Sequence, residues 1–324
     1  MPHALDREEL LPAVAFGGVR MPRPRSGAAP QSLAVVLLAE LGLAPRAWFP
    51  SAVLADLLHD LGTTEAGARA VVRRLARRGV LEGRRSGRRT EYRLTEAAAV
   101  ALARGGRAQA AFPRRAEEWD GRWTLVAFSA PQDAGTERSM LRARLRWRGF
   151  APLYDGVWVS PQEPGDLVET VVAETATASL TLFRAEHLPV RDAATRDPAD
   201  VWDLDAVGEQ YAAFLAAWTP ELARARAGAV QGADALRGRV AVADDYRRFV
   251  VLDPRLPVRL MPRGWPRAAA RRLCADLFDA LADPTLDHVR AVAARHGTTV
   301  DVRLHTLDDL ADGRVVVAAE RAVR

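Results

Sequence analysis

The sequence predicts a multidomain α+β protein with an N-terminal winged helix-turn-helix, a central ferredoxin-like α+β domain and a mainly helical C-terminal domain. Its 324 residues exceed what one hydrophobic core normally organises. Three helical patterns and a hairpin come first, then alternating strands and helices, then a long apolar helical stripe. The predicted divisions are a disordered tail at 1–30, a winged helix at 31–103, a linker at 104–118, a ferredoxin-like domain at 119–195 and helices at 196–324.

Charge is unevenly distributed along the chain. Residues 1–110 contain 17 arginines and 10 acidic residues, whereas residues 111–324 contain 29 arginines and 31 acidic residues. The chain has no lysine and much alanine, which suggests a GC-rich coding sequence, so the number of arginines alone says little about function. A basic excess confined to one end indicates that this end binds nucleic acid.

The chain is predicted to be cytoplasmic and to bind no membrane. It has no run of about 18 apolar residues, the length that a membrane-spanning helix needs. The apolar stretch at 10–19 follows acidic residues, whereas a signal peptide begins with basic ones. The single cysteine, Cys274, excludes an intramolecular disulfide and favours a reducing compartment.

The N-terminal third begins with a proline-rich and glycine-rich segment, for which we expect disorder. A first helix is predicted over 31–43. A second is predicted over 51–62, with Ser51 as its N-cap and Gly62 as its C′ residue.

The third helix and the hairpin that follows it complete the winged-helix pattern. The helix is predicted to begin at Thr63 or Thr64, to run to Arg78 and to stop at Gly79. The hairpin is expected over 80–95, with its two strands flanking the dipeptide Ser86-Gly87. In a winged helix the third helix enters the major groove and the hairpin is the wing.

Arginines dominate both of these elements. In the third helix, three of them recur at i, i+4 and i+8, and four more are placed at the wing tip. Arginine can pair bidentately with guanine or with phosphate, so this pattern suits DNA. The alternative is an ordinary solvated helix face in an arginine-rich chain. The candidate DNA-binding residues are Thr64, Arg69, Arg73, Arg74, Arg77, Arg84, Arg85, Arg88 and Arg89.

The central domain is predicted from alternating element types. Strands are expected at 122–129, 153–161 and 179–186, the middle one being a strand pair or a bent strand. Helices are expected at 136–149 and 164–176. This order, with room for one more strand, is typical of a ferredoxin-like domain.

The C-terminal part is predicted to be mainly helical. An apolar stripe runs from Leu204 to Trp218 and is expected to end at Thr219-Pro220. Further helices are expected at 235–253 and 265–281, and paired strands could form at 298–304 and 313–320.

Five stretches give the chain a resemblance to the PaaX-type family of phenylacetic-acid degradation repressors. They are "VVRRLARRGVLEGRRSGRRTEYRLT", "WDGRWTLVAFS", "LRARLRWRGFAPLYDGVWVSP", "WDLDAVGEQYAAFL" and "DYRRFVVLDPRLPVRLMPRGWP", of which the last is the most specific. Asp244 departs from the family pattern, because many members have a histidine just before the Asp-Tyr-Arg sequence.

The resemblance implies a homodimeric transcriptional repressor of a catabolic or secondary-metabolism operon. Such a protein would bind a palindromic operator in double-stranded DNA and release it on binding phenylacetyl-CoA, another acyl-CoA or an organic acid. Three arginines of the 136–149 helix recur at i, i+4 and i+8: Arg138, Arg142 and Arg146. They could bind the phosphates of coenzyme A, although a solvent-exposed helix face is the simpler interpretation. The candidate effector-binding residues are Arg142, Arg146, Tyr246, Arg247 and Trp265.

The alternative function is a metal-dependent nuclease built on the central domain, whose fold resembles that of the CRISPR-adaptation nucleases. Those nucleases place an aspartate at the end of the first strand to hold Mg²⁺, but here Ser129 occupies that place and Asp133 follows later. No histidine pairs with another histidine or with cysteine at metal-binding spacing. We therefore expect no enzyme, no catalytic residue, no metal and no cofactor.

Overall fold

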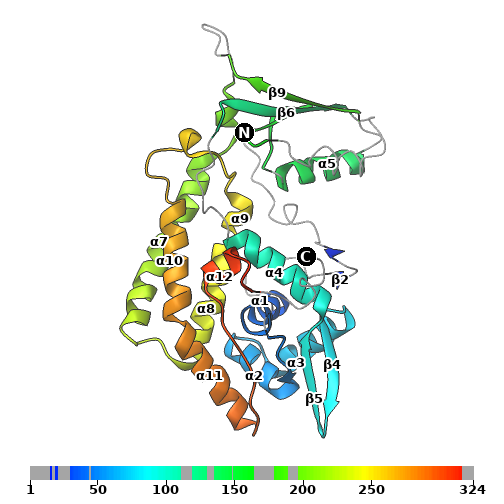
Figure 1. The fold of residues 1–324 in the computed structure, drawn as a ribbon, viewed down its shortest axis with the longest axis vertical. Coiled ribbons are helices and arrows are strands. Elements are labelled where there is room, and N and C mark those ends of the chain that lie inside the picture. The colour runs from blue at the N-terminus through cyan, green and yellow to red at the C-terminus, as the bar shows by residue number, and fades with distance from the viewer. Residues whose placement is uncertain are drawn as a thin grey trace. The chain divides into compact units, whose positions relative to one another are not determined.

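The computed structural model describes residues 15–16, 19–20, 30–43, 45–110, 119–129, 135–147, 149–163, 179–188 and 196–315. The chain forms two compact units (Figure 1). The first contains Met1–Pro12, Pro113–Gln210 and Val251–Trp265, and the second contains Ala13–Phe112, Tyr211–Val250 and Pro266–Arg324. The predicted winged helix therefore shares a compact unit with most of the C-terminal helices.

The second unit begins with the winged helix. It has the helices α1 (Pro30–Gly42), α2 (Ser51–Asp60) and α3 (Glu65–Arg77), the hairpin β4 (Leu81–Ser86) and β5 (Arg89–Leu94), and the following helix α4 (Glu96–Ala110). A short strand, β3 (Phe49–Pro50), pairs with β5, so the sheet order is β3-β5-β4. Apolar side chains of all three helices and of the sheet are buried together, among them Leu37, Leu54, Leu75, Phe49 and Leu94. The winged helix-turn-helix predicted from the sequence is confirmed.

Local sequence signals explain where most of these helices begin and end. Gly62 and Gly79 have positive φ angles of 88° and 71°, a conformation that glycine adopts without strain, and each follows the C-cap of a helix as predicted. The prediction that Ser51 caps α2 is wrong, because Pro50 is the N-cap and Ser51 is the first helical residue.

The wing turn lies one residue later than predicted. Ser86 pairs with Arg89, so the two turn residues are Gly87 and Arg88 rather than Ser86 and Gly87. Gly87 has a φ of 60° and occupies the first central position of the two-residue turn. A type II′ hairpin turn needs glycine at that position, which explains the one-residue shift.

The central sheet belongs to the first unit. Its strands are β6 (Arg122–Ser129), β7 (Ala151–Tyr154), β8 (Val157–Ser160) and β9 (Ser179–Glu186). They pair antiparallel in the order β7-β8-β6-β9, which is the ferredoxin-like order, and the predicted middle strand is a strand pair. Helix α5 (Gly135–Trp147) packs Leu141 and Leu145 against Val126 and Trp158 of the sheet. The predicted helix at 164–176 lies outside the described residues.

The remaining helices differ in detail from the predictions. They are α7 (Leu204–Arg226), α8 (Gly232–Tyr246), α9 (Phe249–Leu252), α10 (Arg267–Ala280), α11 (Ala282–Arg295) and α12 (Leu307–Ala311), with 3-10 turns at Pro198–Val201 and Val258–Leu260. The helix predicted over 235–253 is interrupted between Tyr246 and Phe249. Pro220 does not end α7 but lies inside it. Leu222, two residues further on, is buried, and its packing helps to offset the hydrogen bond that the proline removes.

Three other predictions are corrected or fall partly outside the described residues. Residues 298–304 form no strand, and 316–320 of the expected partner strand are not described. Within the segment expected to be disordered, β1 (Ala15–Phe16) pairs with β2 (Val19–Arg20), as their strand-forming residues allow. The first part of the predicted linker is helical, because α4 continues to Ala110.

A buried arginine joins the winged helix to the C-terminal helices within the second unit. The Arg239 side chain, on α8, is 1% exposed, and its Nε donates to the carboxylate of Glu40 on α1 at 2.8 Å. Its other nitrogens donate to the carbonyl oxygens of Phe278 at 2.6 Å and His305 at 2.7 Å. Its guanidinium also lies 4.5 Å from the centre of the Phe278 ring. Because each of its three nitrogens donates to an oxygen, the cation is compensated in the interior.

Candidate nucleic-acid interface

Helix α3 separates an apolar face from a basic one. Ala68, Val71, Val72 and Leu75 are buried against the rest of the winged helix. All four arginines that the sequence assigned to DNA contacts on this helix are exposed: Arg69, Arg73, Arg74 and Arg77. The 3.6-residue period of a helix produces this separation, since apolar and basic residues recur with the same period but on different sides.

The start of α3 is fixed by a side-chain cap. The hydroxyl oxygen of Thr64 accepts a hydrogen bond from the backbone N–H of Gly67 at 3.1 Å, so Thr64 is the N-cap. An N-cap residue satisfies one of the backbone donors left free at a helix start. Thr64 therefore stabilises the start of α3, and its hydroxyl oxygen is already hydrogen-bonded within the helix. Its exposed position still leaves it beside the basic face.

The α3 arginines differ in their partners. Arg69 forms an ion pair with Glu65 one turn earlier on the same helix. The side chains of Arg73, Arg74 and Arg77 form no hydrogen bond or ion pair with any residue that the structure describes. Exposed cations without an internal partner can bind phosphate or base edges without first breaking another contact. These three residues, rather than Arg69, are the most available cations of the helix.

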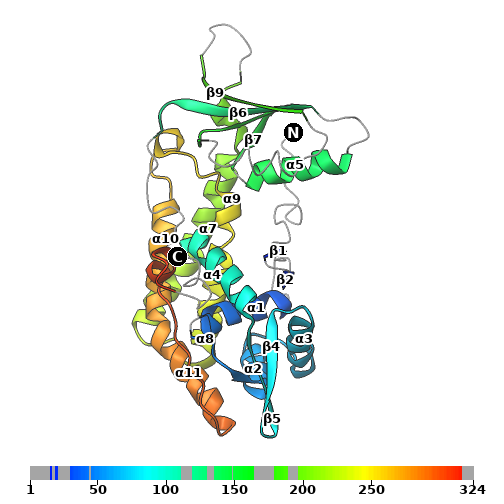
Figure 2. The same cartoon turned by 45° about the vertical axis from the view of Figure 1, so that its right-hand side comes forward.

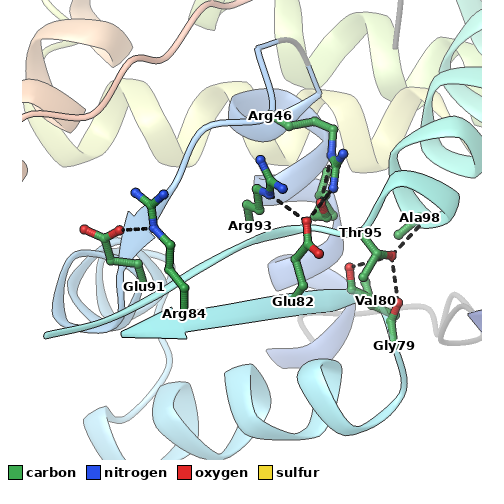
Figure 3. A network of polar contacts seen from close by, with 10 residues as sticks. Arg46, Gly79, Val80, Glu82, Arg84, Glu91, Arg93, Thr95 and Ala98 are labelled. Carbon is green, nitrogen blue, oxygen red and sulfur yellow. Dashed lines mark hydrogen bonds and ion pairs between the residues drawn. The ribbon is translucent and has the colours of Figure 1, made fainter. Parts of the chain in front are cut away.

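The wing arginines also fall into two groups. Arg84 donates from Nε to Glu91 across the hairpin at 2.8 Å (Figure 3), and its guanidinium lies 4.2 Å from the centre of the Trp48 ring. Arg85 and Arg88 are exposed and have no side-chain partner among the described residues. Arg89 donates from Nη1 to the backbone oxygen of Gly297 at 3.3 Å. The tip thus presents two unpartnered cations, whereas Arg84 helps to hold the hairpin together.

The sequence did not predict a second ion-pair cluster, which lies near the base of the wing. Glu82 of β4 accepts hydrogen bonds from Arg46 and from Arg93 of β5, both at 2.6 Å (Figure 3). Arg46 also donates to the backbone oxygen of Leu94 at 2.6 Å, and Arg93 stacks over Trp48 with its guanidinium 4.3 Å from the ring centre. A local signal existed, since Glu82 and Arg93 are directly opposite in a hairpin of this register. The contributions of Arg46 and Trp48 had no local signal, because they precede the hairpin by more than 30 residues.

The candidate effector residues are divided between the two compact units. Arg142 and Arg146 belong to the first unit, where Arg142 pairs with Asp155 at 2.7 Å and Arg146 lies 5.3 Å from the centre of the Trp158 ring. Trp265, also in the first unit, donates its indole N–H to Asp253 at 3.3 Å. Tyr246 and Arg247 belong to the second unit.

Tyr246 is a core residue. Its ring is 1% exposed and packs against Phe214 and Phe249, with centroid distances of 6.0 Å to each. The structure places Tyr246 in the core of the second unit, and its role in binding an effector stays a prediction. Arg247 pairs with Asp244 within one turn of chain, at 2.5 Å.

The first unit has two adjoining pockets, one of which is lined by two arginines of α5. One, of about 320 Å³, is lined by Arg142, Arg146, Pro152, Leu153, Tyr154, Asp155, Trp158 and Arg196. The other, of about 360 Å³, has apolar walls that include Trp123, Leu125, Val159 and Leu188, and it shares Leu153, Tyr154 and Arg196 with the first. The Arg142 Nε–H and the Trp158 indole N–H are buried and find no hydrogen-bond acceptor among the described residues. Unsatisfied buried donors are costly, so these two groups suit an acceptor from a ligand.

The described residues contain no group of three or more histidine, cysteine, aspartate or glutamate side chains that could hold a metal ion. Ser129 is the last residue of β6, the place where a metal-binding nuclease of this fold has its aspartate. Asp133 lies outside the described residues. In the described part of the chain, every helix is too short or too polar to cross a bilayer.

Comparison with known proteins matches three segments of the chain to one family. Residues 29–98 match the model of a PaaX-like protein, residues 116–196 match the PaaX protein central Cas2-like domain, and residues 202–291 match the PaaX-like protein C-terminal domain.

Two individual proteins agree with these matches. The chain is 29% identical over 245 residues to the transcriptional repressor PaaX of Escherichia coli, covering 73% of this chain and 75% of that one. Among solved structures, the uncharacterized protein Rv0674 of Mycobacterium tuberculosis is similar, with a TM-score of 0.58 and 25% sequence identity, covering 81% of this chain and 99% of that one. With its winged helix, its Cas2-like sheet and its C-terminal helices each matched in order, the chain belongs to the PaaX-like family of transcriptional repressors.

Proposed function

We propose that this protein is a transcriptional repressor that binds double-stranded DNA through α3 and the wing. The observation that carries this proposal is the set of exposed arginines without internal partners on these two elements: Arg73, Arg74, Arg77, Arg85 and Arg88. In a winged helix, these elements meet the major groove and the neighbouring phosphates. The apolar face of α3 is used for folding, which leaves the basic face available for DNA.

The expected binding mode is symmetric. A homodimer would place two copies of α3 about 34 Å apart, one turn of DNA, or a multiple of that spacing, and would therefore bind a palindromic operator. The arginines near the N-terminal half of α3 would read base edges, and those of the wing tip would contact phosphates. Phosphate contacts release counterions, so the affinity should fall steeply as salt rises.

The experiment that tests this proposal is a binding titration with purified protein and the DNA upstream of its own gene. Fluorescence anisotropy at several salt concentrations should show specific binding that is at least about 1,000-fold tighter than binding to random DNA. Equal affinity for the upstream DNA and for random DNA would contradict the proposal.

The effector is proposed to be an organic anion with an apolar body, such as phenylacetyl-CoA, another acyl-CoA or an aromatic acid. The two adjoining pockets of the first unit support this, because one is basic and the other is largely apolar. A carboxylate or phosphate oxygen could accept hydrogen bonds from Arg142 Nε and the Trp158 indole, with Arg146 and Arg196 adding positive charge. Binding would lift repression if the bound dimer prefers a spacing of its α3 helices that does not fit the operator.

The effector proposal is tested by adding phenylacetyl-CoA, free coenzyme A or phenylacetate to the protein–DNA complex. Release by the thioester alone would identify an acyl-CoA effector, whereas release by phenylacetate would identify the free acid. The variant Arg142→Gln should need about 10- to 100-fold more of the active compound, because hydrogen bonds to charged groups contribute about 1.5–3 kcal/mol. Its DNA affinity without effector should match that of the wild type, and an unchanged response to effector would exclude this pocket.

A further inference from the structure

Helix α11 contacts α2 of the winged helix at two points, one in the middle of α11 and one just after its C-terminal end. The His288 imidazole lies 2.8 Å from the carboxylate of Asp60, and the His296 imidazole lies 2.9 Å from that of Asp56. Arg295 is also near Asp56, with its Nη2 3.8 Å from the same carboxylate oxygen. Asp56 and Asp60 are one helical turn apart on α2, so α11 lies along this helix (Figure 2).

The same end of α11 also contacts the wing. Gly297, the second residue after the helix, accepts the hydrogen bond from Arg89 at 3.3 Å. Arg89 directly follows the two turn residues of the wing tip. In both views, the end of α11 and the tip of the β4–β5 hairpin lie at the same end of the second unit (Figures 1 and 2). A duplex that contacts the wing tip is therefore within side-chain reach of the end of α11.

The end of α11 carries donors that suit a phosphate. The Arg295 side chain is 58% exposed. Since His296 already contacts Asp56 at the shorter distance, Arg295 can turn toward an external anion while Asp56 keeps a partner. Thr299 is exposed, and neither its hydroxyl nor its backbone N–H donates a hydrogen bond to a described residue. Arginine, threonine hydroxyl and backbone N–H groups are among the usual phosphate-binding groups in protein–DNA complexes.

We propose that the end of α11, from Arg295 to Thr299, is a second DNA-backbone contact beside the wing. It extends the interface beyond the winged helix into the C-terminal part of the chain. Its ligand is the phosphate backbone of double-stranded DNA, and it carries no base specificity of its own. This inference rests on the proposed function, because the position of the duplex follows from binding by α3 and the wing.

The competing interpretation is that α11 only braces α2. In that case Arg295 would act through Asp56, and losing either residue would have the same effect on DNA binding. The variant Asp56→Asn separates the two interpretations. As a phosphate contact, Arg295 is released by Asp56→Asn, and a negative charge near the duplex disappears, so the DNA affinity stays equal or rises.

The test uses the full-length protein with its specific DNA, measured by fluorescence anisotropy over a series of salt concentrations. For Arg295→Gln, we expect an affinity about five-fold lower and a salt slope smaller by about 0.9, the value for one lost phosphate contact. The loss should be similar for specific and for random DNA. The matched control is Arg272→Gln on α10, which removes the same charge from an exposed arginine without a side-chain partner among the described residues. It should leave both quantities unchanged.

Each outcome decides the proposal. An unchanged salt slope in Arg295→Gln, while the wild type binds its DNA specifically, would overturn the α11 contact and leave the repressor proposal intact. Equal losses in Arg295→Gln and Asp56→Asn, with no change in slope, would show that α11 is only a brace. If the wild type itself binds specific and random DNA equally, both the repressor proposal and this contact fail. Thermal melting of each variant confirms that the protein measured is folded.

Discussion

Arg239 and the arginines of α3 and the wing are the same residue type in opposite environments. Arg239 is 1% exposed, and its guanidinium is bound by one carboxylate and two carbonyl oxygens. Arg73, Arg77 and Arg88 are exposed and have no side-chain partner among the described residues. Arg239 therefore serves the fold, and the others are available to a polyanion.

The comparison suggests a criterion: the number of internal partners, rather than charge, should distinguish a structural arginine from one that is available to bind DNA. The cost of removing Arg239 should appear in the stability of the protein. The cost of removing an unpartnered arginine should appear in DNA affinity and in its salt dependence. Variants of the two groups should therefore give separable results.

The largest expected effect is the loss of stability in Arg239→Ala. Removing one partner of a buried ion pair leaves the other uncompensated and costs about 3–5 kcal/mol. Glu40 would then be buried without its cation, and burial already raises the pKa of its carboxyl. The free energy of unfolding from urea titration measures this effect. Arg272→Gln is the surface control and should change that free energy by less than about 0.5 kcal/mol; equal stabilities of the two variants would refute the structural role of Arg239.

The next effect is a loss of DNA affinity without a loss of stability in Arg73→Gln. We expect about 1–3 kcal/mol of binding free energy if Arg73 reads a base, or a salt slope smaller by about 0.9 if it contacts phosphate. Arg69→Gln sharpens the comparison, because Arg69 is already paired with Glu65 and should lose less affinity. A larger loss in Arg69→Gln than in Arg73→Gln would show that the internal pair does not limit DNA binding.

A smaller effect is expected at the start of α3. Thr64→Ala removes the side-chain cap and should lower the free energy of unfolding by about 1 kcal/mol, whereas Thr64→Ser keeps a capping hydroxyl. Chemical denaturation of both variants measures the difference. Thr64→Ala and Thr64→Ser proteins of equal stability would show that the hydroxyl does not stabilise the helix.

The smallest expected effect is a change in the pH dependence of stability at His305. Burial, and secondly the charge of Arg239, lowers the pKa of the His305 imidazole below its ordinary value of 6.5. A group with a lowered folded-state pKa stabilises the protein fully above its unfolded pKa, and this stability is lost as the pH falls toward the folded value. His305→Phe should therefore lose less stability than the wild type between pH 7 and pH 5. The same decrease in the free energy of unfolding between pH 7 and pH 5 in both proteins would contradict the expectation.

The sequence predicted the winged helix well because its signals are local. The α3 helix has a capping residue, an apolar period of 3.6 residues and a terminal glycine, and all three act within the helix itself. The hairpin was predicted for the same reason, although its turn is shifted by one residue because glycine is needed at the first central position of that turn.

The parts that the sequence did not predict depend on contacts between distant residues. Glu40 and Arg239 are 199 positions apart, and Asp56 and His296 are 240 positions apart. No periodicity or spacing reports such a pair. The same limit explains residues 298–304, where β-branched residues favour a strand but no described segment pairs with them. Tyr246 was assigned to a ligand by motif, and only its packing against Phe214 and Phe249 identifies it as core.

The distance between Glu40 and Arg239 also has a consequence for biosynthesis. During translation, Glu40 leaves the ribosome long before Arg239 of α8 does. The Phe278 and His305 carbonyls, which accept the other two hydrogen bonds of Arg239, follow later still. The ion pair between Glu40 and Arg239 therefore cannot form until α8 has been synthesised, and its full set of hydrogen bonds forms later still. A truncated translation product that ends before α8 would lack this contact between α1 and the C-terminal helices.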